Sequence, residues 1–177
     1  MGRVSPAARS TGATQAPDLV ADELEDFEGD RLEVDFDLEA VRLQELSFAG
    51  VEAASGSIAR ASLKGVSLAE SHLRGLRLLD VVAEGVDAAN GDWSGATLRR
   101  VAFVNCGLTG LDLNEAVLEN VTFRGCKLDY ANLRFARLTR VTFDGCTLVD
   151  TDAQGSQIRS TRFAHCRMIG TDSARPS

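Results

Sequence analysis

Residues 101–145 read VAFVN CGLTG LDLNE AVLEN VTFRG CKLDY ANLRF ARLTR VTFDG when they are written in groups of five. The third letter of every group is Phe or Leu, and the first letter is always small or apolar. Two inward-facing positions in every five fit neither the 3.6-residue period of a helix nor the two-residue period of a strand. The backbone must therefore turn a corner after each group.

The same five-residue pattern extends over residues 36–170. Every fifth residue from Leu38 to Met168 is apolar, and the residue two places before it is small or apolar. Gly occupies the last place of ten groups, for example at Gly65 and Gly125. A glycine there fits a corner that needs a tight or positive-φ conformation.

A second period of 20 residues groups four fives into one coil. Identical side chains recur at this spacing in a Phe column and a Cys column: Phe103, Phe123, Phe143 and Phe163; Cys106, Cys126, Cys146 and Cys166. Stacking of like residues in successive coils is the one-dimensional packing of a solenoid. We therefore expect both columns to form structural core ladders.

The groups at 111–115 (LDLNE) and 131–135 (ANLRF) resemble the pentapeptide repeat family, whose consensus is roughly Ala-(Asp/Asn)-Leu-x-x. The resemblance covers about three quarters of the chain. It implies an all-β fold, a right-handed quadrilateral parallel β-helix of about seven coils. At about 4.8 Å per coil, such a rod is about 32 Å long.

The chain divides into four parts. We expect a disordered N-terminal tail over 1–17, an acidic N-terminal cap or linker over 18–35, the β-helix over 36–170, and a short C-terminal tail over 171–177. Pro17 and Asp18 could start a short helix over 18–27 that caps the rod; the alternative is a disordered acidic tail. The last coil either pairs end to end with a second copy or is shielded by the tail, so the protein is a monomer or an end-to-end homodimer.

Charge is unevenly distributed along the chain, whose net charge is −7. Residues 40–177 hold 16 basic and 15 acidic residues. Between 18 and 39, Arg31 is the one basic residue among eleven acids: Asp18, Asp22, Glu23, Glu25, Asp26, Glu28, Asp30, Glu33, Asp35, Asp37 and Glu39. The acidity therefore belongs to the N-terminal segment rather than to the repeat.

Catalytic and metal chemistry find little support in the sequence. A linear Cys ladder cannot converge on a tetrahedral zinc ion, and buried free Cys behaves as a small hydrophobe. His72 and His165 fall at outward positions without spaced partners. We therefore expect no enzyme, metal or cofactor. No apolar run approaches the ~20 residues of a membrane span, and residues 1–17 lack the apolar core of a signal peptide, so we expect a cytoplasmic protein.

Sorting outward residues by the 20-residue period gives two charged faces. The basic face is a candidate partner-binding surface and carries Arg60, Arg77, Arg99, Arg100, Arg137, Arg140 and Arg159. The acidic face, a second candidate, carries Glu52, Asp92, Asp112, Glu115 and Asp152. Either face could also be an ordinary solvated surface.

The family resemblance implies a protein-binding function. Its best-known members bind type II topoisomerases such as DNA gyrase by imitating DNA, and can protect gyrase from quinolone antibiotics. B-DNA carries about 19 charges over about 32 Å, whereas the repeat is nearly neutral, so the charge match is poor. The alternative is a generic interaction scaffold that binds an acidic partner through the basic face. Direct binding of nucleic acid is not expected for a protein of this net charge.

Overall fold

Residues 12–171 are described by a computed structural model, and strands dominate them. One 3-10 turn, η1 (Ala21–Glu23), precedes thirteen strands. Their bounds are β1 (Glu25–Asp26), β2 (Asp35–Glu39), β3 (Val41–Gln44), β4 (Ser55–Lys64), β5 (Arg77–Glu84), β6 (Thr97–Val104), β7 (Val117–Arg124), β8 (Arg137–Thr139), β9 (Thr142–Asp144), β10 (Thr147–Val149), β11 (Gln157–Arg159), β12 (Arg162–Ala164) and β13 (Arg167–Ile169).

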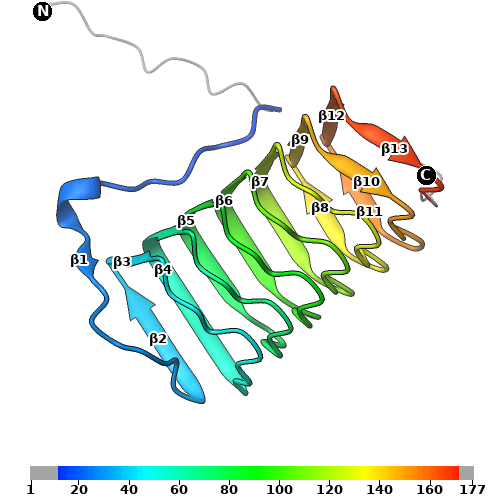
Figure 1. Cartoon of the computed structure of the whole chain (residues 1–177). Helices are drawn as coiled ribbons and strands as arrows, with labels where there is room; N and C mark the ends of the chain where they lie inside the picture. Colours follow the sequence, from blue (N-terminus) through cyan, green and yellow to red (C-terminus); the bar gives the residue numbers. More distant parts are fainter. Residues whose placement is uncertain (1–11, 172–177) are drawn as a thin grey trace, which may run out of the picture.

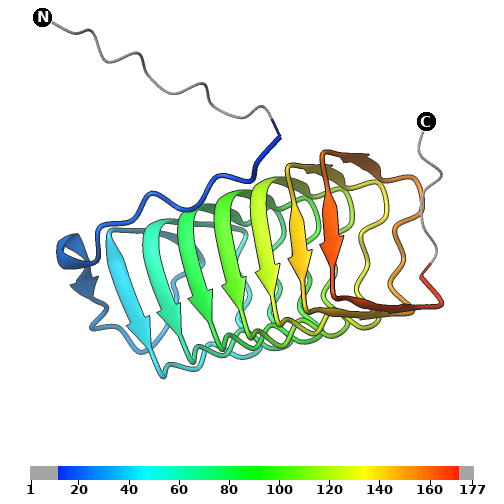
Figure 2. The same cartoon turned by 90° about the horizontal axis from the view of Figure 1, so that it is seen from above.

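The strands wind into a four-sided rod (Figures 1 and 2). All pairings between named strands are parallel. Every pairing except β1–β3 joins residues 20 apart, as in Leu78↔Leu98 and Ala83↔Phe103. In the β1–β3 pairing, Glu25 lies opposite Val41. Strands β5, β6 and β7 each wrap two faces of a coil. The predicted right-handed quadrilateral parallel β-helix of about seven coils is therefore confirmed.

The corners of the rod have left-handed backbone conformation. Every fifth residue from Ala40 to Gly170 has a positive φ of 50–71°, with the exception of Ser55. Glycine adopts this region without a Cβ penalty, whereas other residues pay a cost. The ten glycines that end a repeat group all lie at such corners, which explains why the sequence places them there.

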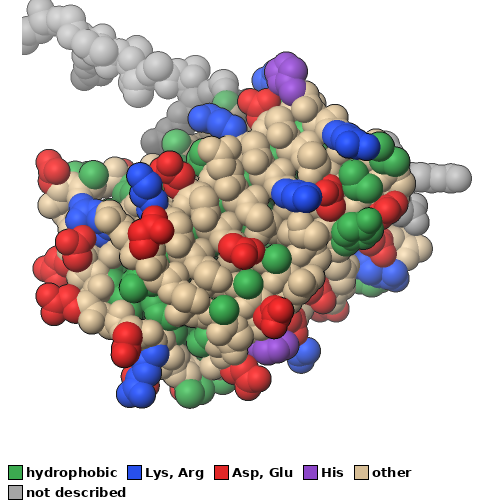
Figure 3. All heavy atoms as spheres, viewed as in Figure 1, with side chains coloured by type: hydrophobic (Ala, Val, Ile, Leu, Met, Phe, Trp, Pro, Cys, Tyr) green, Lys and Arg blue, Asp and Glu red, His purple; other side chains and the backbone are tan. Residues whose placement is uncertain are grey.

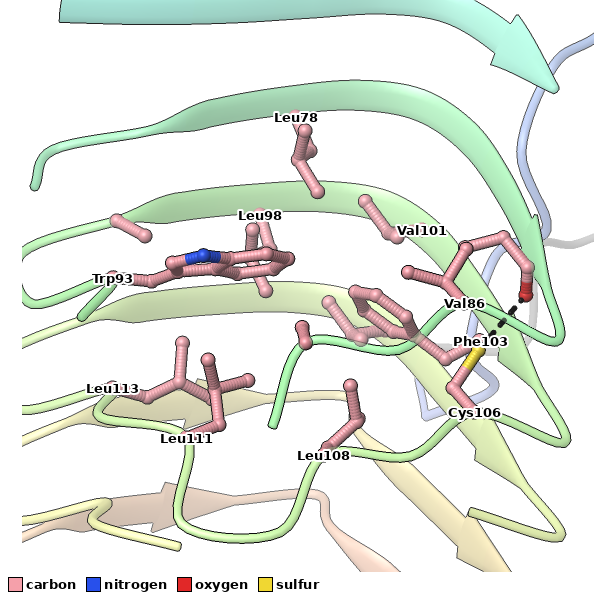
Figure 4. Packing of buried hydrophobic residues seen from close by; sticks show 14 of the residues in the cluster. Leu78, Val86, Trp93, Leu98, Val101, Phe103, Cys106, Leu108, Leu111 and Leu113 are labelled. Carbon is pink, nitrogen blue, oxygen red and sulfur yellow. Dashed lines mark hydrogen bonds between the residues drawn. The ribbon is translucent and has the colours of Figure 1, made fainter. Parts of the chain in front are cut away.

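The interior of the rod is filled by stacked side chains. The rings of Phe103, Phe123, Phe143 and Phe163 stack with centroids 5.1, 4.9 and 4.9 Å apart. Trp93 is buried in the same interior (Figure 4), and its indole Nε1 donates to Ser71 Oγ at 3.0 Å. An indole N–H in an apolar core needs such a partner.

The Cys column also lies in the core. Cys106, Cys126 and Cys146 are buried and Cys166 is half-buried, and all four are free thiols. Each sulfur lies 3.3–3.5 Å from backbone carbonyls, for example Cys106 Sγ from Ala83 O (Figure 4). Among the described residues, no three His, Cys, Asp or Glu side chains are placed to hold a metal ion.

The N-terminal segment closes the first coil. The helix expected over 18–27 is wrong: only η1 is helical, and β1 pairs with β3. Phe27 packs edge-on against Phe48 with ring centroids 6.0 Å apart, and Leu32 is buried in the core cluster. Strand pairing with the exposed edge of the first coil satisfies backbone groups that a helix would leave open. No helix in the described part of the chain is long and apolar enough to cross a membrane.

Candidate functional site

The N-terminal strap, residues 12–20, runs along one long edge of the rod. It starts beside β8 and β9 and passes back toward the first coil, against the direction in which the coils advance (Figures 1 and 2). The disordered tail expected over 1–17 is therefore wrong for residues 12–17. Residues 1–11 lie outside the described part of the chain.

Backbone amides of the strap bind side chains at the corner of the rod. Gln15 N donates to Asn120 Oδ1 at 3.2 Å, and Asp18 N donates to Asp80 Oδ1 at 2.8 Å. Both acceptor residues are only 5 % exposed. A buried polar side chain needs a hydrogen-bond partner, and the strap supplies one to each.

The hydroxyl of Thr14 anchors the other end of the strap. Thr14 Oγ1 donates to Arg140 O at 3.1 Å and lies 2.9 Å from the hydroxyl of Thr142. The contacts of the strap therefore span the coils from Asp80 to Thr142.

These contacts fall on a corner column, defined here as Arg60, Asp80, Arg100, Asn120 and Arg140. Arg100 donates two hydrogen bonds of 2.6 Å to the two carboxylate oxygens of Asp80. Arg140 Nε donates to Asn120 Oδ1 at 2.9 Å. The Arg100 bonds lower the pKa of Asp80, against the opposing effect of burial, and the Asp18 amide lowers it further. Bidentate Arg–carboxylate pairs are strong and geometrically specific.

Much of the predicted basic face is neutralised within the chain. Arg60 pairs with Glu39 at 2.7 Å, Arg99 with Glu119 at 3.6 Å, and Arg140 with the same Glu119. Three members of the face make no ion pair with another described residue: Arg77, Arg137 and Arg159. The basic face therefore offers less free positive charge than its sequence indicates.

Three carboxylates of the predicted acidic face accept hydrogen bonds from the backbone of the rod. Asp92, Asp112 and Asp152 each accept a hydrogen bond of 2.8–3.1 Å from the amide two residues later. Such Asx turns hold the backbone of each coil in its turn. Two of the carboxylates also meet an arginine, since Arg74 pairs with Asp92 at 2.6 Å and Arg134 with Asp152 at 3.2 Å.

Glu52 and Glu115 complete the acidic face. Glu52 forms a backbone bridge with His72 in the next coil, and Glu115 lies at a left-handed corner with φ 58°. The structure thus brings the acidic residues together along one side of the rod. Binding of a partner by either the acidic or the basic face stays a prediction.

Two exposed aromatic residues border the acidic face. Tyr130 is 63 % exposed and Phe135 is 54 % exposed, and both lie at left-handed corners with φ 59° and 55°. The Phe135 ring lies over Gly155, where a Cβ would come within 2.5 Å of it. The five-residue burial pattern does not predict a role for either residue. Their signal is an aromatic residue in the last place of a group, the place that Gly often fills.

The C-terminal coil leaves apolar side chains uncovered by the described residues. Ile158, Phe163 and Met168 are 40–42 % exposed, and Ile169 is 51 % exposed. Ile158, Phe163 and Met168 surround the open end of the core next to Phe143. Residues 172–177 lie outside the described part of the chain, so pairing of this end with a second copy or with the tail stays a prediction.

The two histidines lie at the surface. His165 Nδ1 is 3.0 Å from Asp144 Oδ1, and this contact lowers the pKa of Asp144. The side of the rod seen in Figure 3 carries charges of both signs, interspersed with neutral residues. The candidate sites of this protein are therefore its long faces and corners.

Comparison with known proteins agrees with this architecture. Residues 96–172 match the family model "Pentapeptide repeat region". No curated protein sequence matches the chain.

Several solved structures are similar. A trypsin-treated variant of QnrB1, described as a plasmid-mediated fluoroquinolone resistance protein, is 10 % identical, with 82 % of this chain and 91 % of that chain covered and a TM-score of 0.49. HetL from Nostoc sp. strain PCC 7120, described as involved in heterocyst differentiation regulation, is 15 % identical, with coverage of 81 % and 93 % and a TM-score of 0.27. Over residues 96–172 the chain is similar to the pentapeptide repeat family, and the left-handed corners that close its five-residue groups recur from residue 40 to residue 170.

Proposed function

We propose that this protein is a non-enzymatic rod that binds another protein through its acidic face and the two aromatic side chains beside it. The observation that carries the proposal is the exposure of Tyr130 and Phe135 at left-handed corners. A bulky residue is uncommon in that conformation. Aromatic side chains in such positions are suited to act as anchors in a protein interface.

The charge around the aromatic pair indicates a basic partner surface. Asp112 and Glu115 precede it in the coil before, Asp129 lies next to Tyr130, and Asp150 lies one coil after Tyr130. Three bases lie nearby in this coil, Lys127, Arg134 and Arg137, and of these Arg134 pairs with Asp152 and lies 5.6 Å from the centroid of the Phe135 ring. Complementary charge mainly raises the association rate and the specificity of an interface, so the partner would present Lys and Arg here.

The most specific candidate partner is DNA gyrase or another type II topoisomerase. Support comes from the resemblance to the pentapeptide repeat family, whose best-known members act on these enzymes as DNA mimics. The surface of a topoisomerase that holds DNA is basic, which suits the acidic face. Such a partner would also place the protein in the cytoplasm. The poor match to the charge density of DNA makes the aromatic anchors more important to this proposal.

The experiment is titration of the full chain into a gyrase supercoiling assay, with and without a fluoroquinolone. We expect inhibition, or rescue from drug-induced cleavage, at micromolar protein or below. The double variant Tyr130→Ser with Phe135→Ser should lose at least tenfold in potency. The corner variant Asn105→Ser, in another part of the same rod, is the control and should keep full potency.

An inactive wild-type protein would exclude gyrase, and equal potency of the aromatic variant would exclude this face. A generic scaffold that binds an acidic partner through the basic face is the second candidate. The observation in its favour is that Arg77 and Arg137 make no ion pair within residues 12–171. In that case Arg77→Glu with Arg137→Glu should abolish capture of the partner, and the aromatic variant should not.

A further inference from the structure

We propose that the corner covered by the N-terminal strap is a binding site for an extended acidic peptide, and that residues 14–18 are its built-in occupant. We call this site the peptide lane. It consists of the acceptors Asp80 and Asn120 and a row of outward residues beside them: Ser62, Val82, Ala102, Thr122 and Thr142. This inference does not depend on the gyrase proposal.

The spacing of the acceptors matches the spacing of amides in an extended chain. Asp80 and Asn120 are two coils apart, which is about 9.6 Å. Gln15 and Asp18 are three residues apart, which is about 10 Å in an extended chain. Their two amides donate to the two acceptors. The lane therefore binds the main chain of its occupant at two positions three residues apart, through side-chain acceptors.

The acceptors are held ready for this contact by the rod itself. Two hydrogen bonds from Arg100 fix the carboxylate of Asp80, and one from Arg140 fixes the amide oxygen of Asn120. Both acceptors are almost fully buried when the strap covers them, and an occupant of the lane takes up hydrogen-bonding capacity that the two arginines leave free. Groups that are oriented in advance lose little freedom on binding.

Small residues let the peptide backbone approach the sheet. The outward row of the peptide lane contains no residue larger than Val and no charge from Ser62 to Thr142. All five members are half-buried, whereas Arg162, the next residue of the same row, is exposed. The hydroxyl contact between Thr14 and Thr142 marks the end of the lane.

Charge favours an acidic occupant. Asp18 lines the same surface hollow as Arg60, and its carboxylate is among the charges that raise the pKa of Arg100, after the bonds and charge of Asp80. Pro17 has no N–H to satisfy between the two bonded amides, and its fixed φ keeps the segment extended. The ligand class is therefore an extended acidic segment with free amides at positions i and i+3.

The strap is held lightly enough to be exchanged. Among residues 12–20 only Thr14, Pro17 and Leu19 are even half-buried. Because the strap is tethered, it competes with any external peptide at a high effective concentration. An external ligand therefore binds measurably only when the contacts of the strap are weakened.

The test uses the full chain with Gln15→Pro and Asp18→Pro, which remove the two donated amides while leaving the coils unchanged. A fluorescent peptide of residues 12–20 is titrated against this variant and followed by anisotropy. We expect saturable binding to the variant and at least tenfold weaker binding to the wild type. A control peptide that carries the same two prolines should bind the variant at least tenfold more weakly than the native peptide.

The lane variant Asn120→Leu, added to the double proline chain, should also weaken binding of the native peptide at least tenfold. Amide hydrogen exchange of the wild-type chain tests the occupant directly, without any substitution. The amides of Gln15 and Asp18 should exchange more slowly than that of Ala16. Equal exchange of the three amides, no saturable binding to the double variant, or equal binding of the proline peptide would each overturn the proposal.

Discussion

The two ends of the rod differ in what covers them. At the first coil, Phe36 is 6 % exposed because Leu32, itself 9 % exposed, and other residues before β2 fold over it. At the last coil, Phe163 is 41 % exposed although it stacks on the fully buried Phe143 at 4.9 Å. Phe143 and Phe163, which occupy the same place in successive coils, thus have different environments. A solenoid residue is buried by the coils on both sides of it, not by its own coil.

The largest expected effect comes from a charge placed in the Phe column. Phe123→Asp should prevent folding, because it puts an unpaired carboxylate between two stacked rings in a closed core. Circular dichroism and a thermal melt of the purified variant provide the measurement. A cooperative melt close to that of the wild type would show that the column does not face inward.

The matched control is Phe163→Asp in the same column. Its side chain already meets solvent on one side, so the carboxylate can stay hydrated. We expect this variant to fold, with a melting temperature much closer to the wild type than that of the Phe123 variant. If both substitutions were equally damaging, the last coil would have to be covered by another copy or by the C-terminal tail.

A smaller effect is expected from truncating side chains at the two ends. Leu32→Ala should lower the free energy of unfolding by about 2 kcal/mol or more, since it opens a cavity under the N-terminal cover. Met168→Ala, at the open end, should cost less than about 1 kcal/mol, as surface substitutions usually do. Urea unfolding of both variants gives the comparison. A larger loss for Met168→Ala would reverse the assignment of the closed and open ends.

The contact between the strap and Asp80 adds a pH-dependent contribution to the stability of the rod. The pKa of Asp80 is lowered in the folded protein by Arg100, against burial, with help from the Asp18 amide. A depressed folded pKa means that this stabilisation is complete above the unfolded value, about 3.9. It is lost as the pH falls through the lower folded value.

Asp80→Asn removes this titration. The wild type should therefore lose more stability than Asp80→Asn between pH 5 and pH 2.5, a difference that urea midpoints at the two pH values measure. The substitution Asp37→Asn is a control for acid sensitivity in general, because Asp37 is exposed and makes no ion pair with another described residue. Parallel losses in wild type and Asp80→Asn would remove Asp80 from the acid response.

The sequence predicts the rod well because its pattern is a burial pattern. Every apolar fifth residue reports an inward position, and the ten corner glycines report left-handed backbone. The strap carries no such signal, since its bonds run from backbone amides to Asp80 and Asn120 and have no periodicity of their own. The helix expected over 18–27 fails because the open edge of β3 offers β1 a partner that a local start signal does not reveal. The aromatic corners were missed because they break the glycine pattern without belonging to the core.

The smallest expected effect is on the reactivity of the thiols in the Cys column, not on stability. It compares a thiol inside the rod with the thiol of the last coil. Cys126 is buried, and the neighbouring Cys106 thiol, together with burial, raises the pKa of the Cys126 thiol to about 12. Burial also raises the pKa of Cys166, but this thiol is only half-buried. Because the thiolate is the nucleophile and must be reached by the reagent, a disulfide reagent should label Cys166 first in the native protein. The other three thiols should react only on unfolding.

The dependence of the Cys166 labelling rate on protein concentration then tests whether the last coil pairs with a second copy. If the last coil pairs end to end with a second copy, Cys166 should become protected as the concentration rises, and Cys166→Ser should remove the fast-reacting thiol altogether. A rate that is independent of concentration fits an open end in a monomer. Fast reaction of Cys126 in the native chain would contradict the closed interior, because that thiol has a complete coil on each side.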